Sequence, residues 1–431
     1  MKMELTRRRL LQAGLLTGAG LAASACGSGS GTGSASLAGK KMAVWVWDGC
    51  ISPNVLKQAV AHFTQTKVTP SVIGGDFKQK LVTTMTSRAF LPSITGVKGE
   101  DIASFKGNYA DQFVDLNTLG AGKVTSQYVG WKLKQATTKD GKLLGLPIDI
   151  GPCALFYRHD VFAKAGLPTE PGEVYAAAST WDDYFALGVK LKKADPKAFM
   201  IDDGTSPFTY TVQQGTKRFI DENNHFIGDQ DHIRTAWDRS IKALQLGIVQ
   251  PFADPGSTDS NAAYNNGTVA SSVGAAWHYL DLVQAAPKTS GKWRVATMPG
   301  GPANFGGSFL AIPAQGGDHK LAFEVITWLL NPQNEAQTWV DNGNFPANTG
   351  SYTLPTMTAP VPFFGGQKAI EIFAPAAQKI QAQYEAPADA AVSDPFQSEL
   401  KNVWAKHKDP EKAWSDAVST AKQVAQREGV N

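Results

Sequence analysis

The 431-residue sequence has little histidine, little cysteine and almost no net charge. A formal net charge of +3 is too small to indicate nucleic-acid binding. No two of the 7 histidines have the spacing of metal ligands, so no metal and no other cofactor is expected. The sequence also has no motif that marks an enzyme class, and we predict no catalytic residue.

Apolar residues make up 42% of the chain and charged residues 18%, as is typical of a globular protein rather than a disordered one. The length is sufficient for two or three ordinary domains. The composition therefore predicts a folded protein of more than one domain.

A basic cluster followed by a short apolar run, residues 10–25, opens the chain. Gly14, Gly18 and Gly20 interrupt this run, which is too short and too rich in glycine for a stable membrane span. Residues 1–25 are therefore predicted to be a signal peptide. Its paired arginines, followed by two leucines, resemble a twin-arginine export signal.

The segment Ala22-Ala-Ser-Ala-Cys26 resembles a bacterial lipobox, with Ala23 where leucine is more usual. Residues 26–37 are rich in glycine and serine, a composition that forms flexible tethers. We predict that a lipid on Cys26 holds the protein at the extracellular face of the cytoplasmic membrane. The alternative is a plain secretory peptide with an incidental cysteine.

Two cysteines, Cys50 and Cys153, remain in the predicted mature chain. Because the predicted compartment is oxidising, they are candidates for a disulfide. Buried free thiols are the alternative, since the sequence does not place their Cα atoms.

The first part of the mature chain alternates between strand and helix patterns. The predicted elements are strand 42–47, helix 53–65, strand 68–73, helix 76–88 with Asp76 as its cap, and strand 93–97. This order predicts an α/β fold with a mainly parallel sheet. Ligands gather at the carboxyl ends of such strands, which here are Trp47-Asp48 and residues 98–101.

The stretch 144–160 places two apolar runs on either side of Gly151-Pro152. Leu144–Ile148 and Ala154–Tyr157 read as buried strands, and Asp149 is the acid between them. A Gly-Pro pair interrupts regular structure, so the chain is expected to leave one sheet here and enter another. The alternative is a strand, turn and strand within one domain.

Two further local patterns follow this stretch. Thr180-Trp-Asp-Asp183 resembles a capping box at the start of a helix that runs to about Lys193, and Val269–Val273 is predicted to be a strand.

An ordered series of motifs extends over nearly the whole mature chain. The series consists of Val44-Trp-Val-Trp-Asp48, the stretch 144–160, Ala165-Gly-Leu-Pro168, Thr180-Trp-Asp-Asp-Tyr184, residues 264–270, Gly274-Ala-Ala-Trp277, residues 306–313 and residues 322–330. It resembles the extracellular solute-binding proteins of family 1, the carbohydrate-binding components of ABC importers, of the maltose-binding-protein type. One departure is Ser93 after Pro92, where family members usually carry Asp.

The resemblance implies an α/β, two-lobed, periplasmic-binding-protein-like fold of type II, with hinge crossovers and a ligand cleft between the lobes. Carried onto this chain, lobe one comprises about 38–148 and 306–365, and lobe two about 149–305 and 366–431. The implied crossovers lie near 148–152, 303–308 and 365. A monomer that delivers its ligand to the permease subunits of an ABC importer is expected.

Carboxylates suit the hydroxyls on the edge of a sugar ring, and aromatic rings suit its C–H face. The resemblance implies a cleft lined by residues of both kinds, with glycines at the hinge. It places the loops 47–50, 98–101, 149–153, 205–213 and 275–278 there, along with 306–308. In relatives a tryptophan at the position of Trp277 stacks on a sugar. The candidate ligand-binding residues are Trp47, Asp48, Glu100, Asp101, Asp149, Gly151, Phe208, Tyr210, Trp277, Gly307 and Ser308.

Several of these candidates also have a purely structural interpretation. Trp277 is alternatively a core residue. Asp48 and Asp149 are alternatively turn caps, and Glu100 with Asp101 alternatively favours a helix start. Two other functions stay open: a binding protein for a polyamine, which carboxylates and aromatics also suit, and a secreted glycoside hydrolase, which would need two paired carboxylates.

Overall fold

The structure, a computed structural model, describes residues 41–431. The predicted signal peptide, Cys26 and the tether lie outside these residues. Within the described part no helix is both long and apolar enough to cross a membrane.

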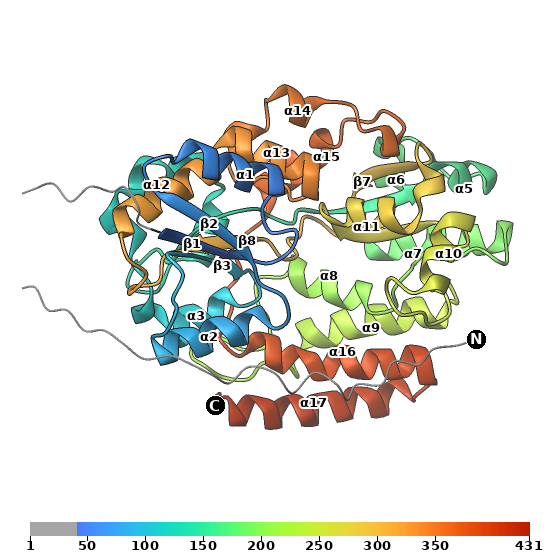
Figure 1. The fold of residues 1–431 in the computed structure, drawn as a ribbon. Coiled ribbons are helices and arrows are strands. Elements are labelled where there is room, and N and C mark those ends of the chain that lie inside the picture. The colour runs from blue at the N-terminus through green and yellow to red at the C-terminus, as the bar shows by residue number, and fades with distance from the viewer. Residues whose placement is uncertain (1–40) are drawn as a thin grey trace, which may run out of the picture. The chain divides into compact units, whose positions relative to one another are not determined.

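The first sheet has five strands in the order β2-β1-β3-β8-β4 (Figure 1). Their bounds are β1 Lys41–Val46, β2 Lys67–Val72, β3 Ile94–Lys98, β4 Gly145–Pro147 and β8 Ser308–Ala311. β1 pairs in parallel with β2 and β3, whereas β8 is antiparallel to both of its neighbours. The predicted, mainly parallel sheet is thus confirmed, with the late strand β8 as its reversed member.

Helices cover the two faces of this sheet, and their caps follow from local sequence. They are α1 Pro53–His62, α2 Phe77–Ser87, α3 Ile102–Asn108, α4 Gly130–Gln135, α12 His319–Leu329 and α13 Pro332–Asn342. The Asp76 side chain accepts a hydrogen bond from the Gln79 amide, which confirms the predicted cap of α2. Single-turn 3-10 segments lie at Ala110–Gln112, Leu116–Leu119, Ala121–Lys123, Thr125–Gln127, Pro287–Thr289, Thr349–Ser351 and Pro362–Phe364.

The second sheet has the order β6-β5-β7, and its central strand β5 is antiparallel to both neighbours. The strands are β5 Cys153–Arg158, β6 Ser271–Ala275 and β7 Trp293–Thr297. Every residue of β5 is buried, as expected of an apolar run covered on both faces. β6 begins two residues after the predicted Val269, because Val269 instead forms an isolated bridge with Phe199.

The chain between β5 and β7 contains seven helices: α5 His159–Lys164, α6 Pro171–Ala177, α7 Trp181–Ala194, α8 Ser206–Gln214, α9 Asp231–Gln245, α10 Thr258–Asn266 and α11 His278–Ala285. The capping box predicted at the start of α7 is present, since Thr180 and Asp183 exchange hydrogen bonds between side chain and backbone.

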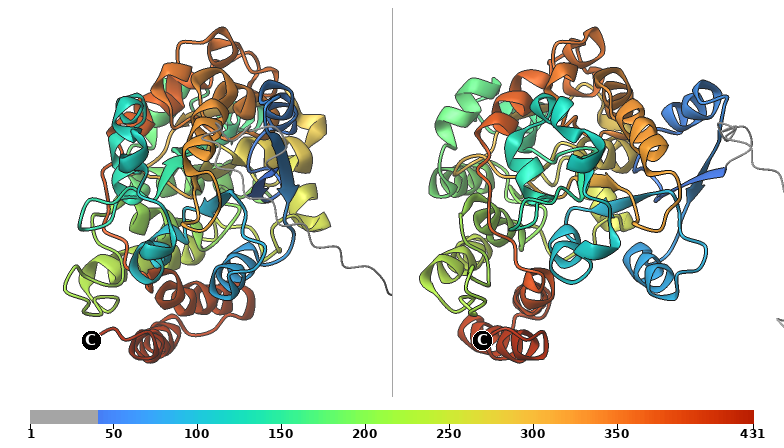
Figure 2. Two further views of the ribbon diagram at one scale, coloured as in Figure 1. Left: turned by 60° about the vertical axis from the view of Figure 1, so that its left-hand side comes forward. Right: turned by 90° about the vertical axis from the view of Figure 1, so that its left-hand side faces the viewer.

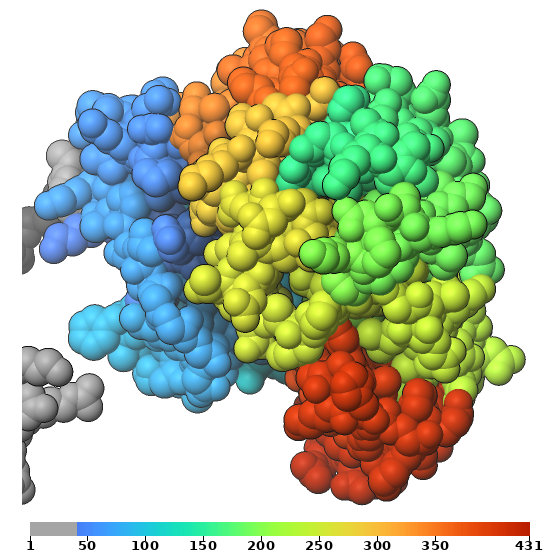
Figure 3. All heavy atoms as spheres, turned by 90° about the vertical axis from the view of Figure 1, so that its right-hand side faces the viewer, coloured from blue at the N-terminus to red at the C-terminus, as the bar shows by residue number. Residues whose placement is uncertain are grey.

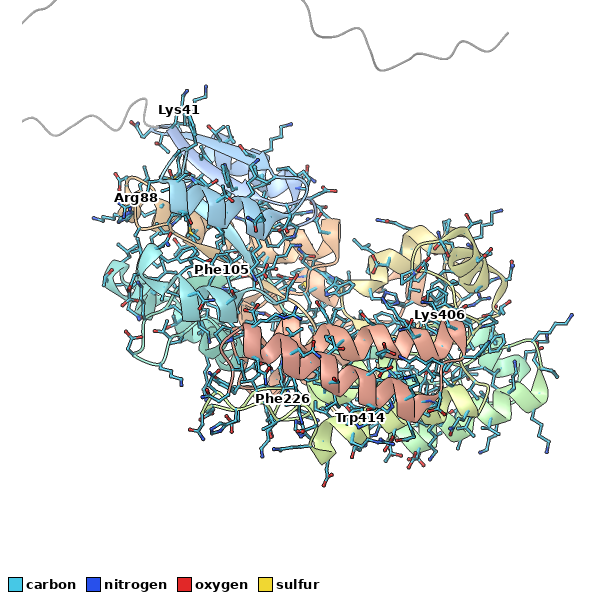
Figure 4. The ribbon with its side chains drawn as sticks, turned by 90° about the horizontal axis from the view of Figure 1, so that it is seen from below. Lys41, Arg88, Phe105, Phe226, Lys406 and Trp414 are labelled. Atoms are coloured by element: carbon cyan, nitrogen blue, oxygen red, sulfur yellow. The ribbon has the colours of Figure 1, made fainter. Side chains whose placement is uncertain are left out.

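The remaining helices are α14 Pro355–Thr358, α15 Ile370–Lys379, α16 Asp389–Lys406 and α17 Pro410–Arg427. α16 and α17 form a hairpin along one end of the molecule (Figures 1, 2 and 4). Ala413, Ala417, Ala421 and Ala425 recur every four residues on α17, and all are buried. Their small side chains let α17 approach its neighbours closely.

The chain passes from the first sheet to the second between β4 and β5 and returns between β7 and β8. The Gly-Pro bend at 151–152 therefore lies at a crossing, as predicted, and not within one sheet. The two crossings pair with each other, since the Phe305 amide donates to the Gly151 carbonyl and the Cys153 amide to that of Ala303. A third segment joins them where the Ile150 amide donates to the Phe345 carbonyl.

The candidate disulfide is absent, because Cys50 and Cys153 are both free and buried. Cys50 packs into the core of the first sheet, and Cys153 packs into the core of the second. The Cys153 thiol instead contacts the Gly151 carbonyl at 3.4 Å. Burial raises the pKa of both thiols, so neither is poised for exchange.

Candidate ligand-binding cleft

A cavity of about 460 Å³ lies where the crossings meet the carboxyl ends of β1 and β3. Figure 3 shows a groove between the N-terminal segment, in blue, and the yellow segment around residues 250–285. The cavity is lined by aromatic, charged and amide side chains and by glycine backbone: Trp47, Asp48, Gly49, Cys50, Lys98, Gly99, Glu100, Gln135, Asp149, Gln213, Arg218, Trp277, Asn304, Phe305, Gly306, Gly307, Ser308, Asn344 and Glu385.

Trp47 forms the aromatic wall on the side of the first sheet. Its ring lies directly over Gly96, where an added Cβ would approach ring atom Cζ3 to 2.6 Å. Phe77 meets the ring edge to face, with 5.2 Å between the centroids. The Lys98 Nζ lies 5.6 Å from the ring centroid. These neighbours fix the ring beside the cavity and leave it half-buried.

Asp149 lies at the floor of the cavity and holds the start of β8. Its Oδ1 accepts a hydrogen bond of 2.8 Å from the Ser308 amide. Burial raises the pKa of this carboxyl to about 6, although the Lys132 charge and the Ser308 hydrogen bond act in the opposite direction. Asp149 is therefore more easily protonated than an ordinary aspartate.

Lys132, on α4, is the buried cation beneath the same floor. It has no exposed surface, and its Nζ donates to the Gly306 carbonyl at 3.1 Å and lies 4.5 Å from the Phe309 ring centroid. Burial lowers the pKa of Lys132 to about 8, against the opposing effect of Asp149. Between about pH 6 and 8 both groups are charged and stabilise each other.

Two glycines allow the crossings to touch. A Cβ on Gly151 would lie 1.9 Å from the Phe305 carbonyl oxygen. At Gly307, where φ is +79°, a Cβ would lie 2.7 Å from the Asp149 carbonyl oxygen. Only glycine fits at either position, so the floor of the cavity is backbone packed on backbone.

Trp277 forms the opposite wall, at the N-cap of α11. Its Nε1 donates to the Phe305 carbonyl at 3.3 Å, and the two rings lie 6.1 Å apart. The indole is thus tied to the second crossing and half-buried, with one side on the cavity.

Three polar side chains of the lining, Arg218, Gln135 and Glu385, bind one another and are called the clasp below. The Arg218 guanidinium, in the loop after α8, lies 2.7 Å from the Glu385 carboxylate. The Gln135 side-chain amide, on α4, donates to both oxygens of that carboxylate at 3.1 and 3.0 Å. The clasp therefore joins helix α4, beside the first sheet, to the loops that contain Arg218 and Glu385.

Seven of the predicted residues line this cavity together: Trp47, Asp48, Glu100, Asp149, Trp277, Gly307 and Ser308. Four do not. Asp101 forms an ion pair of 3.0 Å with Lys78, and Gly151 is buried against Phe305. Phe208 lies in a separate core against Phe396, because residues 206–214 form α8 and not the expected loop. Tyr210 lines a neighbouring cavity.

Several lining residues were not predicted. Asn304 and Phe305 immediately precede Gly306-Gly307. That glycine pair is the sequence feature that could have indicated them as lining residues. Gln135, Arg218 and Glu385 come from three distant segments with no shared motif. The residues 41–431 contain no group of three or more His, Cys, Asp or Glu side chains that could hold a metal ion.

Comparison with known proteins agrees with this geometry. The sequence model described as bacterial extracellular solute-binding protein matches residues 67–364, more than half of the chain. The chain belongs to this family. The resemblance inferred from the motifs is thus confirmed, and the family is one of binding proteins rather than enzymes.

Among relatives of this solute-binding protein, a lactose-binding protein of Rhizobium radiobacter is 23% identical, over 79% of this chain and 82% of the relative. An arabinooligosaccharide-binding protein of Bacillus subtilis is 26% identical, over 44% of this chain and 45% of the relative. The crystal structure of an extracellular solute-binding protein of family 1 matches with a TM-score of 0.83 at 26% identity, covering 90% of this chain and all of that one. The two-lobed α/β fold is therefore shown.

Proposed function

We propose that this solute-binding protein captures a sugar or short oligosaccharide outside the cell and delivers it to the permease of an ABC importer. The observation that carries the proposal is the pairing of Trp47 and Trp277 on opposite walls of a cavity whose floor and rim carry carboxylates and amides. Aromatic faces suit the C–H face of a sugar, and the polar groups suit its hydroxyls. The names of the lactose-binding and arabinooligosaccharide-binding relatives support it.

The proposed lobes are residues 38–148 with 306–365, and 149–305 with 366–431. They would close on the ligand by bending at 148–152, 303–308 and near 365. Closure is driven by contacts that ligand makes with both lobes at once. The pairing of crossings at Gly151 supports the first two hinge points.

The proposed mature protein is a monomer anchored by lipid on Cys26, exported by the twin-arginine route and without catalytic activity. Mass spectrometry of the membrane fraction tests the anchor, because a lipidated protein loses its lipid in a Cys26→Ser variant. Full release of unmodified wild-type protein into the medium would contradict it.

Titration calorimetry against a panel of mono-, di- and oligosaccharides tests the ligand class. We expect at least one sugar to bind with a Kd in the micromolar range or below. Binding to no sugar, together with tight binding to a peptide, a simple polyamine or a metal ion, would contradict the proposal. Release of reducing ends from an oligosaccharide would instead indicate a hydrolase.

A further inference from the structure

A second cavity, of about 660 Å³, lies beside the first, and the two share Trp277 and Phe305 as a common wall. Its remaining lining comes from residues 202–210, 250–264 and 272–285 and from Trp404. Figure 3 shows a hollow where the green and yellow segments of this region meet. The second cavity is therefore built by the surroundings of the second sheet alone.

The two cavities both carry carboxylates but differ in whether basic side chains accompany them. Asp202, Asp203 and Asp281 line the second cavity, and no lysine or arginine of the described residues does so. The first cavity, in contrast, includes Lys98 and Arg218 among its walls. The second cavity also has aromatic surface on several sides, including Tyr210, Tyr264 and Trp404.

Asp202 has one satisfied and one unsatisfied carboxylate oxygen. Its Oδ2 accepts hydrogen bonds from the Tyr264 hydroxyl at 2.6 Å and the Ser272 hydroxyl at 2.8 Å. Its Oδ1 is buried and has no hydrogen-bond partner within residues 41–431. Leaving a buried acceptor without a donor costs about 1–3 kcal/mol, and more for a charged group. Within residues 41–431 the Asp202 carboxylate is therefore held by hydroxyl donors rather than by a cation.

The other two carboxylates, Asp203 and Asp281, are held in place by groups other than lysine or arginine. The Asp203 Oδ1 accepts from the backbone amide and the hydroxyl of Thr205, at 2.7 and 2.8 Å. Burial and the Asp202 charge raise the pKa of Asp203, against hydrogen bonds from Thr205 and the charge of Lys401. Asp281 lies 3.2 Å from His278. In the described part of the chain none of the three carboxylates forms an ion pair with a lysine or arginine.

We propose that the second cavity binds a protonated amino group of the ligand, so that the preferred cargo is an amine-bearing sugar or oligosaccharide. This inference rests on the proposed function, with a sugar ring in the first cavity and the amine beyond Trp277. An ammonium group donates three hydrogen bonds and accepts none, which matches a set of carboxylate acceptors. The faces of tryptophan and tyrosine rings also attract cations.

Calorimetry with matched disaccharide pairs tests the inference. The pairs are lactose with lactosamine and cellobiose with the deacetylated glucosamine disaccharide, in which an amine replaces one or more hydroxyls. At pH 6 we expect the amine member to bind at least tenfold more tightly. The preference should shrink at pH 9, where the amine loses its proton. The titratable groups that line the cavity are Asp202, Asp203, Tyr210, Tyr264, His278 and Asp281, and the charge of Lys401 acts on Asp203.

The outcomes separate this inference from the proposed function. Binding of the neutral sugar with equal or weaker binding of its amine counterpart overturns the inference and leaves the proposed function intact. Binding of neither member of any pair, nor of any other sugar, overturns both. Spermidine serves as the third probe: if it binds tightly where no sugar does, the inference of an amine-bearing sugar fails.

Two variants test whether the amino group of the ligand lies in the second cavity. Asp202→Asn and Asp281→Asn should each bring the ratio of amine to neutral affinity at least fivefold closer to one. The Asp281 side chain is 58% exposed, so its variant is expected to fold even if Asp202→Asn does not. Asp259→Asn is the matched control, because Asp259 is an exposed carboxylate on α10 outside the cavity. An unchanged ratio in folded Asp281→Asn and Asp202→Asn, verified by melting curves, overturns the inference.

Discussion

The two cavities on either side of Trp277 are built in different ways. The first lies at the crossings between the sheets, and its buried charges are paired: Asp149 with Lys132 nearby, and Glu385 with Arg218 at 2.7 Å. The second lies beside one sheet, and hydroxyl groups hold its Asp202 carboxylate. The first is therefore lined by both crossings and by the clasp, whereas the second meets the crossings only at Phe305.

This contrast indicates that the two cavities contribute differently to binding. Under the proposed function, a ligand in the first cavity contacts segments of both proposed lobes, so its binding energy drives the proposed closure. A ligand group in the second cavity contacts only one proposed lobe, so it changes affinity and selectivity more than closure. Four substitutions test this difference, in order of decreasing expected effect.

Gly151→Ala should have the largest effect, because its new Cβ would lie 1.9 Å from the Phe305 carbonyl and force the crossings apart. We expect a loss of about 3 kcal/mol in the free energy of unfolding, measured by urea denaturation. The control is Gly172→Ala on α6, where an added Cβ meets no atom within 4 Å. Wild-type stability in Gly151→Ala would show that the first cavity does not depend on this backbone contact.

Trp277→Ala removes the wall that both cavities share. We expect the Kd of the bound sugar to rise about 30-fold, equivalent to about 2 kcal/mol, measured by calorimetry. Trp328→Ala is the control, since Trp328 stacks on His62 with 4.9 Å between centroids and lines neither cavity. Its melting temperature should fall without a change in Kd. Equal effects of the two substitutions on Kd would contradict a ligand role for Trp277.

Asp149→Asn tests the buried charge at the floor of the first cavity. The pKa of Asp149 is raised from 3.8 to about 6, so between these values the folded protein holds a proton that the unfolded chain has lost. Stability attributable to this group therefore falls as pH rises from about 4 to about 6, by up to about 1.4 kcal/mol per pH unit. In urea denaturation between about pH 4 and pH 6, the unfolding free energy of the variant should lack this pH-dependent decrease.

Asp183→Asn provides a comparison in which the pH dependence of stability has the opposite sign. The Thr180 hydroxyl lowers the pKa of the exposed Asp183, so stability attributable to that group rises with pH through the acid range. If the stabilities of Asp149→Asn and the wild type change with pH in parallel between pH 4 and pH 6, the pKa of Asp149 is not raised.

Arg218→Met should have the smallest effect, by opening the clasp on Glu385. Both side chains are only partly buried, so we expect the sugar Kd to rise about fivefold, equivalent to about 1 kcal/mol. The control is Arg234→Met, which removes a pair with Glu411 remote from both cavities and should leave Kd unchanged. A fivefold rise in both variants would indicate a general loss of stability instead.

Local sequence predicted much of the fold because helix caps and periodicity depend on neighbours in the chain. Asp76 and Thr180 cap their helices as predicted, and the apolar runs around Gly151 form strands of two sheets. The prediction failed at Phe208, where a presumed loop is a helix with its aromatic face in a core. It also failed for the pair Cys50 and Cys153, since each thiol belongs to a different core.

The elements of the first sheet, the family and the glycines near the crossings can be read from the sequence alone. Which charged side chains meet depends on the fold. Gln135, Arg218 and Glu385 are brought together by packing of distant segments, and no local pattern encodes that contact. The same holds for Asp202, whose unpaired oxygen depends on what surrounds it: burial and partnership are properties of the folded neighbourhood, not of the residue.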